Sequence, residues 1–378
     1  MPDRNTPAGA RLATLTASRA FRFFAAGLVV AAITPLIGFS RSIYHARSVP
    51  DCDGAQAIDN TCFIERYIAL TRLQGSDVAL ADLATRQQSN QSLHASCHQL
   101  THAIGRTAGE IQGKAAFSSG TDLCAAGYYH GIVETVMMKI GAAQFRDRAA
   151  SVCAEQREGA PKSHLHYNCV HGMGHGFMAV FQSDVFQSLS GCDVLTDPWE
   201  QRHCYGGVFM ENLSAIGHSS RPSTHLRPHE PLYPCTAVDA RYKGDCYIEQ
   251  TAYALSMRNN DFAAVFALCR NDADAGFRNV CYEGLGGDAA IMASKFVIGA
   301  AARADTLRQL CLLGPDDDAR AHCIMGAIST IVRDTSGDDT QARVVCGALH
   351  DQQLTSVCNN ALREEAQAFP TGPVRHQH

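Results

Sequence analysis

Sixteen cysteines recur along the chain at nearly regular intervals, and their spacing limits the fold more than any other feature. From Cys153 onward they fall into pairs, and after the first of these pairs each cysteine follows its mate by 11 or 12 positions. The second members recur every 35 or 42 residues, a period typical of stacked helical hairpins. We therefore expect an all-α, disulfide-stapled solenoid of helical hairpins.

An even number of cysteines in a chain with an export segment indicates a disulfide framework. Cys97 and Cys124 do not fit the later spacing, and they are paired because they remain once the other pairs are assigned. The expected bonds are Cys52–Cys62, Cys97–Cys124, Cys153–Cys169, Cys192–Cys204, Cys235–Cys246, Cys269–Cys281, Cys311–Cys323 and Cys346–Cys358.

The N-terminus carries a targeting pattern. An apolar run over residues 23–39 follows four arginines and has the minimum length of a membrane-spanning helix. More basic residues precede the run than directly follow it, which places residues 1–22 in the cytoplasm. No small-residue cleavage site follows, so the sequence favours an uncleaved signal anchor. We expect a single-pass protein of the bacterial inner membrane with its C-terminal part in the periplasm, or a secreted protein if the segment is cleaved.

The remaining chain divides into segments by composition and by the cysteine pattern. In each later unit, one helix is expected to end at the first cysteine and the next to open at its partner, as at Cys269 and Cys281. Glycines are concentrated at the starts of these second helices. Each glycine lowers the stability of a helix, so we expect a compensating role, which is close approach of neighbouring helix backbones. The expected segments are a linker (40–51), an N-terminal helical region with His/Glu motifs (52–152), Cys-paired helical repeats (153–368) and a disordered tail (369–378).

This layout resembles the Sel1-like/tetratricopeptide superfamily. The likeness covers roughly residues 150–368 and consists of short helix pairs, small residues at the helix crossings and one cysteine pair per unit. It is greatest to the cysteine-rich, secreted bacterial members of that superfamily. The resemblance implies a right-handed α-superhelix with a concave binding surface, and it implies no chemistry.

Paired polar residues at helical i, i+4 spacing mark the first half of the chain. This spacing puts two side chains on one face of a helix, where an imidazole and a second imidazole or carboxylate can converge on one metal ion. With the helices opening at cysteines, the positive helix N-terminus would keep the imidazoles neutral. The candidate ligands are His98, His102, His130, Glu134, His171 and His175, with Glu211 at a similar distance from its own cysteine.

Other residue patterns exclude several kinds of chemistry. The net charge of −5 gives no electrostatic support for nucleic-acid binding. No CxxCH motif for covalent haem attachment, CxxC redox motif, nucleotide-binding motif, HExxH motif or GxSxG motif occurs. His164 and His166, which precede Cys169, are expected in an exposed loop.

Two classes of function remain. The first is a periplasm-facing metalloprotein that binds Zn, Cu or Fe through the His/Glu residues, with a metal-dependent hydrolase or oxidase as a variant. The second is a non-catalytic envelope scaffold that binds a peptide, a glycan or an envelope protein on its concave face, with histidines that only pack.

Overall fold

The computed structural model describes residues 48–52, 60–214 and 223–369, and those from Pro50 onward form one compact unit. Within these ranges the chain is helical and contains no β-strand, which confirms the all-α prediction. The predicted cytoplasmic segment (1–22) and signal anchor (23–39) lie outside the described residues, as does most of the linker (40–51). None of the helices described is long and apolar enough to cross a membrane.

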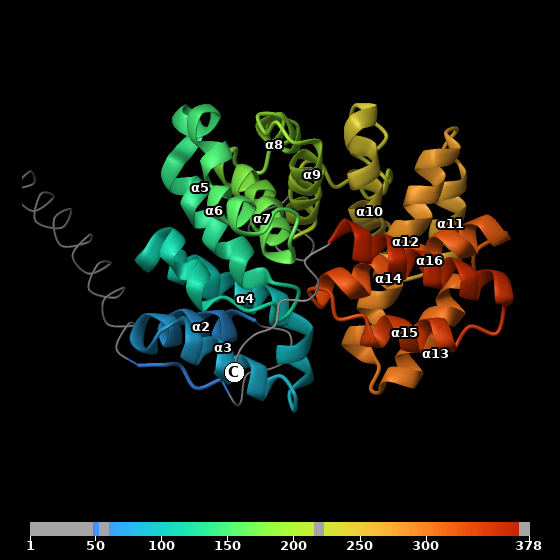
Figure 1. Ribbon diagram of the computed structural model, residues 1–378, viewed down its shortest axis with the longest axis horizontal. Coiled ribbons are helices and arrows are strands. Elements are labelled where there is room, and N and C mark those ends of the chain that lie inside the picture. Colours follow the sequence, from blue (N-terminus) through green and yellow to red (C-terminus); the bar gives the residue numbers. More distant parts are fainter. Residues whose placement is uncertain (1–47, 53–59, 215–222, 370–378) are drawn as a thin grey trace, which may run out of the picture. The chain divides into compact units, whose positions relative to one another are not determined.

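The helices fall into a long and a short set (Figure 1). The long helices are α2 (Thr61–Gln74), α4 (Gln91–Gln112), α5 (Gly127–Arg148, kinked at Gly141), α7 (His164–Val180), α9 (Pro198–Leu213), α10 (Ala240–Met257), α12 (Ala275–Phe296), α14 (Asp317–Asp334) and α16 (Gln352–Ala368). The short elements are α3 (Ser76–Arg86), α6 (Ala154–Gly159), α8 (Val185–Cys192), α11 (Phe262–Arg270), α13 (Ala300–Cys311), α15 (Thr340–Gly347) and the 3-10 helices η2 (Gly113–Ser119) and η3 (Ala149–Ser151).

Each long helix packs mainly against the next long helix along the chain, from α2 to α16. The short helices join them, and four of the disulfides tie the end of a short helix to the following long helix, as in Cys269–Cys281 between α11 and α12. The structure joins all sixteen cysteines in the eight pairs expected from their spacing. The cysteines are largely buried, so each bond lies within the packed layer between helices.

The long helices begin earlier than the sequence analysis expected. Most start about two turns before their cysteine. An Asp, Asn or Ser side chain there accepts hydrogen bonds from the free backbone N–H groups of the first helical turn and so caps the helix. Asp274, for example, precedes Cys281 by seven positions and accepts hydrogen bonds from the amides of Gly276 and Phe277. The expectation that these helices open at a cysteine is therefore wrong, and α5 departs in the other direction by starting after Cys124.

Glycines let the long helices approach within backbone contact. A Cβ atom on Gly174 of α7 would lie 2.2 Å from the carbonyl oxygen of Cys204, and one on Gly207 of α9 would lie 2.0 Å from that of His171. The crossing of α12 and α14 repeats this reciprocal contact, with Gly286 of α12 against the carbonyl oxygen of Cys323 and Gly326 of α14 against that of Glu283. Side chains at these positions would overlap backbone atoms, which explains the glycines that interrupt otherwise helical segments.

The C-terminal end of the described chain is ordered by an aromatic contact. Phe369, which the sequence analysis placed in a disordered tail, is buried and stacks on His164 with ring centroids 4.2 Å apart. Burying a large aromatic side chain favours the ordered position. The rest of the predicted tail lies outside the described residues.

Candidate metal centre

Five histidine rings meet where α4, α5 and α7 pack side by side. We call them the histidine cluster: His98 and His102 from α4, His130 from α5, and His171 and His175 from α7. Contacting rings have centroids 4.9 to 5.5 Å apart. The i, i+4 spacing on α4 and α7 turns both rings of each pair to one helix face, and the sequential packing of the helices brings the faces together.

The cluster contains two groups of three potential ligands. The first triad is His98, His102 and His130, and the second is His130, His171 and His175. Within each triad the ligand atoms lie within 4.8 Å of one another. Ligands that share a tetrahedral ion at about 2.1 Å are roughly 3.4 Å apart, so side-chain shifts of about an ångström would complete either site. His130 belongs to both.

Several ring nitrogens in the cluster have no hydrogen-bond partner among the described residues. Both nitrogens of His130 and Nε2 of His175 are buried and unpartnered. Leaving a buried polar atom unsatisfied costs about 1–3 kcal/mol, so histidines that serve only packing are expected to find partners. His130, with both nitrogens unpartnered among the described residues, is the member that differs most from a structural histidine.

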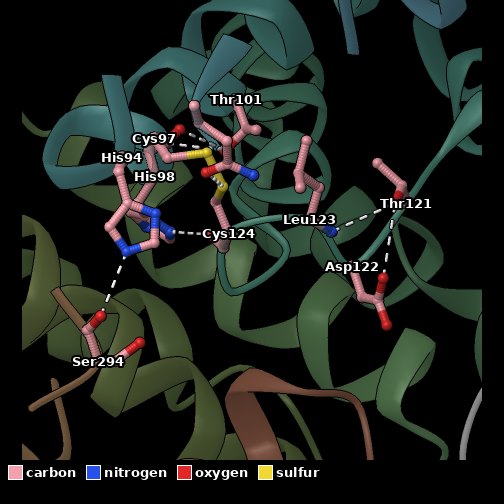
Figure 2. The surroundings of a disulfide bond; sticks show 10 residues. His94, Cys97, His98, Thr101, Thr121, Asp122, Leu123, Cys124 and Ser294 are labelled. Carbon is pink, nitrogen blue, oxygen red and sulfur yellow. Dashed lines mark hydrogen bonds between the residues drawn. A yellow bond between two sulfur atoms is a disulfide. The ribbon is translucent and has the colours of Figure 1, made fainter. Parts of the chain in front are cut away.

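In two cluster members, His98 and His175, one ring nitrogen has an oxygen acceptor. Nδ1 of His175 lies 2.7 Å from Oε2 of Glu211 on α9. Nδ1 of His98 lies 2.8 Å from the carbonyl oxygen of Cys124, as Figure 2 shows beside the Cys97–Cys124 disulfide. Because these oxygens accept, each Nδ1 donates, and in a neutral ring with this tautomer Nε2 carries the lone pair. Such outer contacts typically fix the tautomer and orientation of metal-bound histidines.

The segment that supplies this carbonyl has an unusual backbone. Cys124, Ala125 and Ala126 all adopt positive φ angles, between 55° and 56°. This left-handed conformation costs non-glycine residues roughly 1–2 kcal/mol each. The disulfide to Cys97 and the hydrogen bond from His98 hold the segment in place at the start of α5.

Glu134 and Glu211 lie beside the triads and belong to neither. Glu134 forms an ion pair of 2.7 Å with Arg106, and its Oε2 is 3.9 Å from Nδ1 of His102. Burial raises the pKa of the Glu134 carboxyl despite Arg106. Burial also opposes ionisation of Glu211, yet the hydrogen bond from His175 holds the pKa of that carboxyl below its usual range. Both carboxylates thus act on the histidines from outside the ligand groups.

Burial keeps four of the cluster imidazoles neutral. It lowers the pKa of His98 to about 4 and the pKa of His102, His130 and His171 well below the usual value. The predicted cause, the positive helix N-terminus, is wrong for α4 and α7. Their cluster histidines lie in the second to fourth turns, beyond the first turn in which the dipole acts. Neutral rings carry the lone pair that a metal ion needs.

Two cavities border the cluster, and they have no lining residue in common. The first, of about 410 Å³, is lined by His98, His102 and His175 together with Arg106 and both carboxylates. The second, of about 420 Å³, is lined by His171, aromatic side chains and several charged groups. Its charged lining includes Arg333 and Glu249, which come from helices far along the chain and were not predicted as site residues.

Other histidines near the cluster have separate roles. His164 and His166 are buried in the first turn of α7, so their assignment to an exposed loop is wrong. Nε2 of His166 lies 3.0 Å from Oε1 of Glu200. Ser163 caps the helix before them, a signal that the sequence analysis overlooked.

Comparison with known protein families, with curated proteins and with solved structures finds no match to this chain. The resemblance to Sel1-like repeats therefore stays a likeness of layout without family support. The eight disulfides indicate an oxidising compartment, extracellular or periplasmic.

Proposed function

We propose that this protein binds a transition metal ion through the histidine cluster. The observation that carries the proposal is His130, which is 3% exposed, has both ring nitrogens unpartnered among the described residues and is surrounded by four other imidazoles. Imidazole ligands suit Zn, Cu and Fe alike, so the donor set favours a transition metal over Mg or Ca without selecting one.

The rest of the proposal concerns where the site operates. The apolar run at 23–39 would anchor the chain in the bacterial inner membrane, with the disulfide-bonded part in the periplasm. The long helices would form a solenoid of the Sel1/tetratricopeptide type, supported by their sequential packing. The two cavities beside the triads would leave an ion an open side, as in sites that bind a further small ligand.

Metal content tests the proposal. Full-length, untagged protein is purified in detergent, exposed to a weak chelator, and analysed for Zn, Cu and Fe by mass spectrometry. We expect at least one equivalent of one metal per chain, and its loss in His130→Gln, which keeps a polar side chain of similar size. The matched control is His164→Gln, a buried histidine whose Nδ1 also lacks a described partner but which lies outside the cluster.

The scaffold alternative predicts a different result. If the wild-type protein holds no stoichiometric metal as purified, and none after separate reconstitution with Zn²⁺, Cu²⁺ and Fe²⁺, the metal proposal is wrong. The histidines would then serve only packing, and binding of a peptide, glycan or envelope protein on the helical surface would become the better account.

A further inference from the structure

His130 differs from the other cluster members in how its two nitrogens are placed. A histidine that binds one ion commonly gives its second nitrogen to an acceptor, as the contacts of His98 and His175 illustrate. The second nitrogen of His130 has no such acceptor among the described residues, although the ring is buried. Two unpartnered nitrogens on one buried ring require two partners.

The two triads supply candidate partners for both nitrogens. His130 is their shared member, and its ring lies 5.5 and 5.3 Å from those of His98 and His102, and 4.9 and 5.0 Å from those of His171 and His175. The four outer rings come as one pair from α4 and one pair from α7, and the two pairs meet where the rings of His102 and His175 lie 5.0 Å apart.

The cavities follow this division in part. His98 and His102 of the first triad line the first cavity together with His175, whereas His171 of the second triad lines the second cavity. His130 is among the lining residues of neither. An ion in the first triad and an ion in the second could thus each face open space while His130 lies between them.

Building on the proposed metal binding, we infer that His130 bridges two metal ions, one in each triad. Each ring nitrogen bonds one ion, which places the ions roughly 6 Å apart across the ring. A neutral imidazole offers one lone pair and one N–H. Binding of the second ion displaces that proton to solvent and leaves an imidazolate with two lone pairs. No electron is transferred.

The surrounding charges accommodate two cations. Glu134 lies beside His102 of the first triad, and Glu211 accepts the hydrogen bond of His175 in the second. Each triad therefore has its own carboxylate, which offsets part of the charge of an ion held by neutral imidazoles. Arg106, a cation beside the first triad, is already paired with Glu134.

Copper titration with spin measurement tests the bridge. Full-length protein in detergent is stripped with a chelator, loaded with Cu²⁺, and cleared of weakly held copper. We expect two coppers per chain whose electron paramagnetic resonance signal integrates to far less than two spins at low temperature, because a bridging imidazolate couples them antiferromagnetically. The control His164→Gln keeps two coupled coppers.

Variants that remove one triad separate the two sites. His98→Ala with His102→Ala leaves the second triad, and His171→Ala with His175→Ala leaves the first. Each is expected to bind one copper with a full one-spin signal, and circular dichroism verifies that the helices persist. A wild-type protein with one copper, or with two coppers and a full two-spin signal, overturns the bridge while leaving metal binding intact. Absence of stoichiometric copper overturns both proposals.

Discussion

The α7–α9 and α12–α14 crossings use the same backbone packing for different side chains. At both crossings, a glycine of each helix lies against a backbone carbonyl of the other helix. The glycine of α9 lies against the carbonyl of His171 in α7, and the glycine of α14 lies against the carbonyl of Glu283 in α12. The two residues therefore occupy equivalent positions. Glu283 lies 2.8 Å from Nδ1 of His322 on the neighbouring helix, whereas the ring of His171 faces that of His130 at 4.9 Å.

This difference shows that the helix packing does not require histidine. At the α12–α14 crossing the polar side chains satisfy one another in a local, partly exposed pair. At the α7–α9 crossing the equivalent histidine joins a buried cluster whose nitrogens are incompletely partnered. The packing is shared by both halves, and the unpaired imidazoles distinguish the first.

The largest expected effect tests the shared packing. Gly174→Ala and Gly286→Ala would place a Cβ atom 2.2 and 1.9 Å from a backbone carbonyl oxygen, so each should destabilise the protein by about 2 kcal/mol or more. The denaturation midpoint measures this. Gly244→Ala in α10 is the control, because its Cβ would meet nothing within 4 Å and the change should stabilise the helix by up to ~1 kcal/mol. Equal midpoints for all three variants would contradict the backbone contact.

A second prediction concerns the carboxylates of the two crossings. Glu211→Gln weakens the acceptor that orients His175, so affinity for Zn²⁺ should fall about 10- to 100-fold. Glu283→Gln, which changes a carboxylate of the other crossing, should leave that affinity unchanged. Competition with a coloured chelator measures both. A similar loss in the two variants would show that the charge acts at long range rather than through His175.

The smallest expected effect is a pH dependence of the α12–α14 pair. The hydrogen bond to Glu283 raises the pKa of His322, and Asp318 adds to the shift. A raised histidine pKa stabilises the fold fully below the unfolded value of about 6.5, and this contribution is lost as pH rises through the folded pKa. Glu283→Gln should therefore lower the denaturation midpoint more at about pH 6 than at about pH 9.

The exposed Asp305–Arg308 pair provides the control for this dependence. Aspartate and arginine side chains ordinarily stay charged from about pH 6 to pH 9, so Asp305→Asn should have the same small effect at both values. A pH-independent loss in Glu283→Gln would mean that His322 is not charged in the folded protein.

The helical array was largely predictable because its signals are local. The cysteine intervals identify which helices are joined, and the glycines indicate where backbones meet. The helix starts were missed although their signal is also local: Asp197, Asp274, Asp316 and Asp351 each stand seven positions before a cysteine and cap the helix. Taking the cysteine as the first residue placed the histidines of α4 and α7 too close to the helix N-termini.

The candidate site was predictable only in part. The i, i+4 histidines could be expected to share helix faces, but which faces meet depends on how α4, α5 and α7 cross. The role of Glu211 beside His175 depends on α9 in the same way. The second cavity combines residues from α7, α9, α10, α12, α14 and α16, and the sequence gives no pattern that joins them.

The left-handed segment at Cys124 has a consequence for the order of maturation. The carbonyl that orients His98 belongs to a cysteine in a strained conformation, tied to the helix of His98 by a disulfide. Until the thiols of Cys97 and Cys124 are oxidised, nothing covalent holds that carbonyl against the imidazole. Oxidative folding would therefore precede metal acquisition, and a newly made, reduced chain would carry the same five histidines while competing poorly for metal ions.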